Sequence, residues 1–306
     1  MQTITKSTFQ KRIEGDNLWL EFDPASAVQS SVTAFNYNVL PDEESVGAAM
    51  LDELKAYAGQ KDGDISIVLL GGRGAQAMYK IVGRLAETDK LDSLLGRLNV
   101  FTQDALAPMR MGNSLSFVRD FERLLGRKFF AKIKSFTPMM TETEGIEGEL
   151  IKYLERLESV GGIDIFFLGL GPEANAASHL CYIKPNSGAK YTDIAGIIQI
   201  SPSILEHHIN KFKVGGSSVS ADDEAECRSA SYILTLGPAA ILRARKIVQS
   251  IVDASTAPAK RESFARMVST EISDDAETRN KQLDENPGLW IRLHNDVTSF
   301  VLPDLF

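Results

Sequence analysis

The chain has 306 residues, of which 43% are hydrophobic and 24% are charged. These proportions are typical of a globular protein with an ample core, and no apolar segment reaches the roughly 18 residues needed to span a bilayer. The formal net charge is −8 and no basic tract occurs, so we expect neither nucleic acid nor membrane as a partner.

The cysteines and the first residues indicate the compartment. The two cysteines, Cys181 and Cys227, do not suggest a disulfide framework. Residues 1–12 are polar and lack the apolar core of a secretory signal, so we expect a cytoplasmic protein. Cys181 follows a predicted strand closely, but a buried structural thiol is the commoner role for such a cysteine than a nucleophile.

The N-terminal 40 residues are predicted to form an extension that packs on one domain, residues 41–306. Residues 18–22 and 32–39 alternate apolar and polar side chains, which indicates half-buried strands. Proline and acids at residues 41–44 are typical of a helix start, and helical spacing continues to about Gly59.

A strand, a glycine-rich turn and a helix follow each other from residue 65. The apolar residues 65–70 lead into the turn, and the helix follows it. This order offers backbone N–H groups and a helix N-terminus to a phosphate, although turns of this kind also occur without ligands. A guanidinium in the turn can bind phosphate with two hydrogen bonds. The candidate phosphate-binding residues are Gly71, Gly72, Arg73 and Gly74.

Asp104 follows a short predicted strand, residues 98–101. An aspartate at this place is either a helix N-cap or a carboxylate of a site. Further along the chain we predict helices over residues 117–130 and 141–159, with a short strand near residue 136 between them.

An apolar run over residues 163–170, interrupted by one aspartate, predicts a strand that is buried on both faces. Ligands of open α/β sheets bind beyond the carboxyl ends of the strands. Glu173, Asn175, Ser178 and His179 follow this strand and are therefore candidates for a site. A plain strand-to-helix turn is the alternative interpretation.

The remaining chain continues the alternation. We expect strands at residues 194–200 and 231–236, a mobile surface loop at 211–226, and a helix after Pro238 that gives way to partly strand-like sequence at 246–252. A helix over 260–268 and strand-like alternation over 289–302 complete the chain. The pattern predicts a single α/β domain with one mostly parallel, Rossmann-like sheet and helices on both faces.

Three stretches together resemble the family of glucosamine-6-phosphate deaminases and 6-phosphogluconolactonases. Residues 160–171 resemble the deaminase GGID signature, residues 70–79 resemble the shared phosphate loop, and residues 101–104 resemble the segment with the catalytic aspartate. The resemblance extends in order over about residues 45–302. It implies that Asp104 abstracts a proton, that Gly71 and Gly72 form the phosphate loop and that Lys260 binds phosphate.

The chain departs from this family where a D-G-H triplet is expected. It has Glu173, Ala174 and Asn175 there, and Leu180 replaces a glutamate. The neutral amide of Asn175 cannot accept a proton near pH 7, which removes the histidine on which the family relies. His179, four residues later, is a candidate displaced acid or base, although a capping or buried histidine is the alternative.

The resemblance leaves three functions open. The first is a deaminase or isomerase of an amino-sugar phosphate, in which Asp104 is the base and Glu173 assists. The second is a non-catalytic or altered-specificity phosphosugar-binding protein, and the third is a 6-phosphogluconolactonase. None needs a metal or another cofactor, and a homo-oligomer stays open. His207 and His208, beside the predicted loop, are candidates for contacts with a lid.

Overall fold

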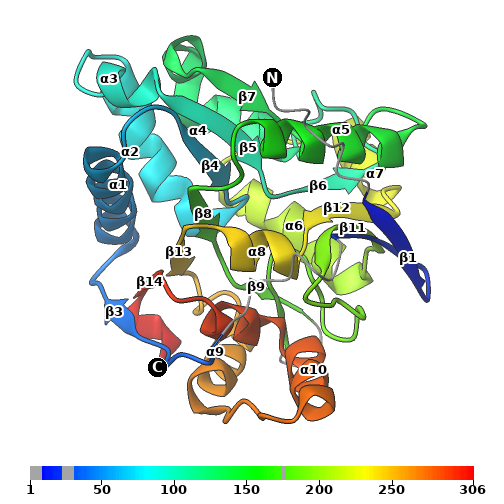
Figure 1. Ribbon diagram of the computed structural model, residues 1–306. Helices are drawn as coiled ribbons and strands as arrows, with labels where there is room; N and C mark the ends of the chain where they lie inside the picture. Colours follow the sequence, from blue (N-terminus) through cyan, green and yellow to red (C-terminus); the bar gives the residue numbers. More distant parts are fainter. Residues whose placement is uncertain (1–8, 23–30, 174–176) are drawn as a thin grey trace, which may run out of the picture.

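The computed structural model describes residues 9–22, 31–173 and 177–306. Within these residues the strands form a seven-stranded sheet, a five-stranded sheet and a two-stranded hairpin (Figure 1). None of the helices found there is long and apolar enough to cross a bilayer.

The seven-stranded sheet is parallel throughout. Every residue of its central strands β4 (Ile65–Leu69), β5 (Leu98–Thr102) and β8 (Ile165–Leu168) is buried, which explains their nearly continuous apolar sequences. The predicted fold class, a single α/β domain with a mostly parallel sheet between helices, is confirmed. The order of the strands is β3 (Tyr37–Val39), β14 (Val297–Val301), β13 (Lys246–Ile251), β8 (Ile165–Leu168), β4 (Ile65–Leu69), β5 (Leu98–Thr102) and β7 (Ser135–Thr137).

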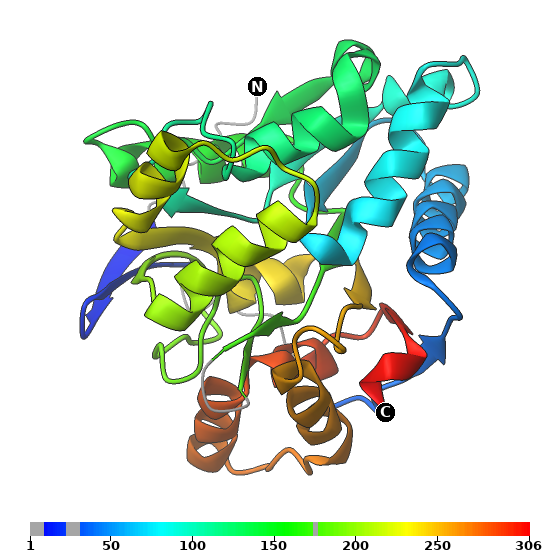
Figure 2. The same cartoon turned by 180° about the vertical axis from the view of Figure 1, so that it is seen from behind.

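Helices cover both faces of this sheet. The connections between parallel strands are right-handed, and the chain adds strands on both sides of β4, so the connecting helices lie on opposite faces. On one face α1 (Glu43–Gln60) packs on α2 (Gln76–Ala86), which packs on α4 (Phe117–Lys132). Two other helices, α5 (Ile146–Ser159) and α8 (Pro238–Arg243), lie close to each other, and both line one cavity that α1, α2 and α4 do not reach. The view from behind brings α2 and α6 to the front (Figure 2). The other helices are α3 (Asp92–Leu95), α6 (Pro202–Val214), α7 (Ala221–Arg228), α9 (Ala259–Ser269) and α10 (Ala276–Glu285).

The five-stranded sheet is antiparallel, and it corrects the prediction of one sheet. The predicted strands at residues 194–200 and 231–236 exist, but they pair with each other in this second sheet. An apolar run indicates that a strand is buried and does not name its partner, which is why the assignment was wrong. The order of the strands is β1 (Gln10–Glu14), β2 (Asn17–Glu21), β11 (Asp193–Gln199), β12 (Tyr232–Leu236) and β6 (Asp104–Ala107).

Strands β1 and β2 come from the predicted N-terminal extension. They form a hairpin whose second strand bonds to β11, and the buried indole of Trp19 lies over Gly196. A Cβ atom on Gly196 would lie 2.7 Å from that ring, so the glycine allows the close contact.

Two local predictions were wrong and a third was right in part. The segment 211–226 is mostly helical, because α6 continues to Val214 and Ser220 caps α7 by accepting a hydrogen bond from the Asp223 N–H. The strand-like sequence predicted at 246–252 does form β13, and the helix before it ends at Arg243. Residues 287–293 form a short 3₁₀ helix, and only the residues that follow form β14.

Two glycines of α1 give a matched test of the α1–α2 packing. A Cβ on Gly47 would lie 2.4 Å from the Met78 backbone nitrogen, whereas a Cβ on Gly59 would meet nothing within 4 Å. We expect Gly47→Ala to lower the free energy of unfolding by about 1–3 kcal/mol, since backbone cannot move aside cheaply. Gly59→Ala should be neutral or stabilising by up to about 1 kcal/mol. Denaturant unfolding measures both, and equal effects would contradict this packing.

Candidate active site

Four central parallel strands end at one pocket. Leu70 follows β4, Gln103 follows β5, Gly169 follows β8 and Asp253 follows β13, and all four residues line it. The chain leaves β4 toward β5 and later enters β8 on the other side of β4, so the pocket lies where the strand order reverses. Ligands of open α/β sheets bind at such a reversal.

The structure brings most of the predicted site residues to this pocket. Those that line it are Gly71, Arg73, Gly74, Asp104, His179 and Lys260. Glu173 is not among the lining residues, and its carboxylate accepts hydrogen bonds from the hydroxyl groups of Ser201 and Ser203. Asn175 lies outside the described residues.

Asp104 is the first residue of β6, so it is not a helix N-cap. Its side chain is buried and Oδ2 accepts a hydrogen bond of 2.7 Å from Gln103 Nε2, while Oδ1 has no partner among the described residues. Burial raises the pKa of Asp104 to about 7, against the opposing effect of the Lys211 charge. A carboxylate with a free oxygen and this pKa is suited to accept a proton at neutral pH.

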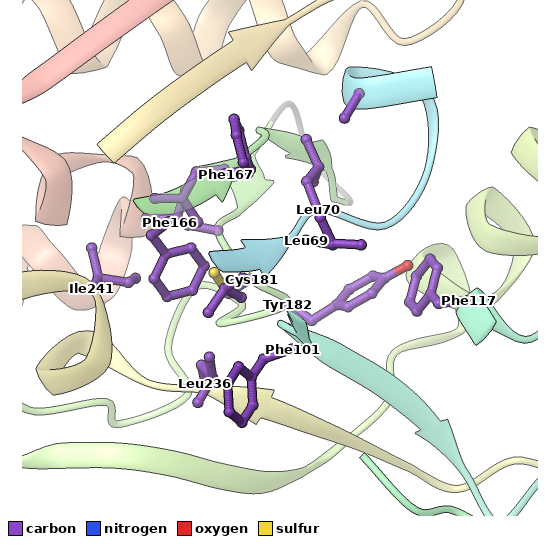
Figure 3. Close-up of a cluster of buried hydrophobic side chains, with 14 of the residues drawn as sticks. Leu69, Leu70, Phe101, Phe117, Phe166, Phe167, Cys181, Tyr182, Leu236 and Ile241 are labelled. Atoms are coloured by element: carbon purple, nitrogen blue, oxygen red, sulfur yellow. The ribbon is translucent and has the colours of Figure 1, made fainter. Parts of the chain in front are cut away.

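Lys211 is the residue of the pocket that the sequence analysis missed. It lies on α6, and its Nζ donates a hydrogen bond of 2.9 Å to the Tyr182 hydroxyl. The same Nζ is 5.2 Å from the ring centroids of both Phe117 and Tyr182, whose side chains lie beside each other (Figure 3). Burial lowers the pKa of Lys211 to about 8, although the Asp104 charge opposes this.

The sequence did contain a signal for Lys211. Ser201 caps α6 with Pro202 in the first turn, and Ile204, His208 and Phe212 follow at helical spacing. This apolar stripe extends beyond residue 211, so it contradicts a loop that begins there.

Tyr182 reaches Lys211 through a strained turn. Leu180 and Ile183 exchange backbone hydrogen bonds of 3.1 and 2.7 Å, and between them Cys181 and Tyr182 have positive φ angles of 50° and 55°. A residue other than glycine costs on the order of 1–3 kcal/mol in this left-handed backbone conformation. Burial also raises the pKa of the Cys181 thiol well above its usual value, which disfavours a nucleophilic thiolate.

His179 lies in a strand, so it does not cap a helix. It belongs to β10 (Ser178–His179), which pairs with β9 (Gly171–Pro172), and its ring stacks on Tyr182 with centroids 4.4 Å apart. A Cβ on Gly171 would lie 2.0 Å from this ring. Burial lowers the pKa of His179 well below its usual value, and neither ring nitrogen has a partner among the described residues.

The predicted phosphate turn is present before α2. Gly72 has a φ angle of 82°, and a Cβ there would lie 2.8 Å from Lys211 Nζ. The Arg73 guanidinium donates to Glu43, and Lys260 Nζ donates to Asp253 and to the Val252 carbonyl oxygen. Both predicted cations therefore already face a carboxylate.

The two other histidines near the pocket are also neutral. His207 lines the pocket, and burial lowers its pKa to about 2. His208 bonds through Nε2 to the Leu115 carbonyl oxygen and through Nδ1 to the Tyr182 hydroxyl, and burial lowers its pKa to about 3. No cluster of metal-binding side chains occurs within the described parts of the chain.

No protein-family model matches this chain, and no curated protein is similar enough in sequence to match. Solved structures do match. A monomeric glucosamine-6-phosphate deaminase superposes with a TM-score of 0.69 at 17% identity, covering 89% of this chain and 98% of that one. The 6-phosphogluconolactonase of Trypanosoma brucei gives 0.61 at 18% identity, with 90% and 98% covered. The enzyme of the same description from Shewanella baltica gives 0.60 at 14%, with 90% and 100% covered.

The chain has their fold. The likeness extends over nearly the whole of each matched structure.

The buried ammonium of Lys211 should be visible in solution. With lysine carrying ¹³C at Cε, we expect one NMR signal to titrate near pH 8, well below the usual lysine value of about 10.4. The signal should vanish in Lys211→Met and persist in Lys184→Met, which removes an exposed lysine. A Lys211 signal that titrates above pH 10 would contradict the buried position.

Proposed function

We propose that this protein binds a sugar phosphate and catalyses proton transfer at the carbon next to its carbonyl group, as a deaminase or isomerase. The observation that carries the proposal is the buried Asp104 carboxylate, with a free oxygen and a pKa of about 7, in the same pocket as Lys211 and the glycine-rich turn. Support also comes from the fold shared with a glucosamine-6-phosphate deaminase and with 6-phosphogluconolactonases.

The phosphate would bind at the start of α2. The turn at Gly71, Gly72 and Gly74 leads into that helix, whose first N–H groups have no partners within the helix. Lys211, which lies against Gly72, would supply the positive charge. Arg73 and Lys260 would strengthen the local potential while they stay paired with Glu43 and Asp253.

The chemistry would use Asp104 first. Its carboxylate removes the proton from the carbon next to the carbonyl, the C–H electrons form a carbon–carbon double bond, and the carbonyl oxygen takes up a proton. The product is an enediol or, where the deprotonated carbon carries an amine, an enolamine. Asp104 then returns the proton to the former carbonyl carbon while the adjacent hydroxyl or amine loses one, which gives a ketose or an imine, and water hydrolyses the imine to the ketose and ammonia. Neutral His179 would donate a ring N–H to the sugar oxygen that gains charge, and Glu173 and Asn175 remain proposed assisting residues.

Removing the proposed base gives the first test. Asp104→Asn should lower kcat/KM for an amino-sugar phosphate at least about 10²–10⁴-fold, because the amide cannot accept a proton. Ammonia release and ketose formation from glucosamine 6-phosphate are the measurements. Equal activity of Asp104→Asn and the unmodified protein would reject Asp104 as the base.

The pH dependence gives the second test. Activity should rise as pH increases through about 7, where Asp104 loses its proton, and fall through about 8, where Lys211 loses its own. Lys211→Arg should shift only the alkaline fall to higher pH, since a guanidinium stays protonated. A flat kcat/KM profile from pH 6 to 9 would contradict both roles.

The turn gives the third test. A Cβ on Gly72 would meet Lys211, whereas Gly63 has a similar φ angle of 77° with nothing within 4 Å of a Cβ. Alanine at either position strains the backbone, and at Gly72, where ψ is −161°, the conformation is one that essentially only glycine adopts. Only Gly72→Ala should weaken binding of a sugar phosphate, tenfold or more by calorimetry. Equal loss in both variants would argue against a phosphate at this turn.

One observation favours the non-catalytic alternative. The Glu173 carboxylate bonds to Ser201 and Ser203 and is not among the residues that line the pocket. Tight binding of glucosamine 6-phosphate without turnover, lost in Lys211→Met, would support that alternative.

A further inference from the structure

A second cavity, of about 680 Å³, lies on the outer side of α4. We call it the arginine groove. It is lined by Ser114, Arg119, Glu122, Arg123, Arg127, Phe130, Ser217 and Ser218. None of these residues lines the candidate active site. Its size is within the range of small-molecule sites, roughly 300–1,000 Å³.

Three arginines give the groove an excess of positive charge, in a chain whose net charge is −8. Arg119, Arg123 and Arg127 follow each other at steps of four in the sequence of α4, and Arg119 and Arg123 share one unbroken helical segment, in which like charges at this spacing repel. Arg119 pairs with Glu122 and Arg123 pairs with Asp120. Within the described residues no acid pairs with Arg127, so its guanidinium is available to an anion.

The backbone of α4 is irregular in the middle of this row. Gly126 has φ and ψ angles of 74° and 163°, which are not helical, and it separates Arg123 from Arg127. A side chain there would be strained, because residues other than glycine rarely adopt such a positive φ. The break alters the direction of Arg127 relative to a continuous helix, and both arginines still line the groove.

Hydroxyl groups line the groove as well as the arginines. Ser217 and Ser218 follow α6, where the Ser217 N–H bonds to the Phe212 carbonyl oxygen at 3.0 Å. Ser114 comes from the loop before α4, and its N–H lies 3.4 Å from Asp223 Oδ2. Guanidinium groups with hydroxyl groups are a donor set for phosphate oxygens.

Phe130 adds an aromatic surface to the same groove. A ligand that meets all of these groups carries a phosphate and a flat or partly apolar ring. We propose that the arginine groove is a second binding site, for a phosphate monoester that bears a ring, separate from the candidate active site.

The groove shares both of its main elements with the active site. Helix α4 begins with Phe117, which contacts Lys211, and α6 carries Lys211 itself and ends next to Ser217 and Ser218. A ligand that joins α4 to the end of α6 therefore restrains the two helices that place Phe117 and Lys211.

The test uses the full chain with Lys211→Met, which disables the anion site of the pocket and leaves the groove intact. The probes are AMP and inorganic phosphate, titrated by calorimetry in 150 mM KCl. We expect AMP to bind with one-to-one stoichiometry and at least tenfold more tightly than inorganic phosphate. Arg123→Ala with Arg127→Ala should weaken AMP binding at least tenfold, and Arg127→Lys should weaken it measurably because a lysine cannot form the paired hydrogen bonds.

Arg84→Ala is the matched control, because Arg84 is an exposed arginine of α2 outside the groove. It should leave AMP binding unchanged, and circular dichroism should show every variant folded. The proposal is overturned if AMP does not bind, if binding disappears between 20 and 150 mM KCl, or if Arg84→Ala weakens it as much as the groove substitutions. Because the background already lacks Lys211, failure here leaves the proposed function untouched.

Discussion

Gln103 is the one residue between β5 and β6, so it links the parallel sheet to the antiparallel sheet. The candidate active site depends on this junction. The Gln103 N–H bonds to the Leu69 carbonyl oxygen at the end of the parallel sheet, and its carbonyl oxygen accepts from the Leu236 N–H of the antiparallel sheet. Its side chain bonds to Asp104 and Cys181. Because the strand changes sheets here, the next residue, Asp104, lies at the carboxyl edge of the parallel sheet, inside the pocket.

The electrostatics of the pocket follow from burial. Asp104 is buried and Lys211 is partly buried, so each charge is costly, and the pKa values of the acid and the lysine approach each other at about 7 and about 8. The stacked rings of His179 and Tyr182 and the ring of Phe117 fill the space around them with side chains that are uncharged near neutral pH. In such surroundings the opposite charge is the main stabiliser of each group, so a substitution that removes either charge should change the proton affinity of the other group.

The two cations predicted to bind phosphate show that a side chain can line the pocket while its charge is already paired. Arg73 and Lys260 do line the pocket, yet Glu43 and Asp253 already neutralise them. These acids are 30 and 7 residues away in sequence, and nothing in the local pattern indicated that they would meet their partners. Lys211 was predicted to lie in a loop and lies instead on α6. The N-cap and the apolar stripe of that helix are visible in the sequence. The role of Lys211 comes from Phe117 and Tyr182, which distant parts of the chain contribute.

The sequence by itself determined the central parallel strands, the glycine turn after β4 and the position of Asp104 beyond β5. These features depend on local patterns, namely buried apolar runs, the glycines at residues 71, 72 and 74 and the periodicity of the following helix. Only the tertiary structure decided that residues 193–199 and 232–236 form a second sheet, that Glu173 turns to Ser201 and Ser203, and that Lys211 approaches Asp104. The physical reason is that strand pairing, ion pairing and burial are contacts between segments far apart in the chain, and a pattern along one segment does not specify the partner on the other.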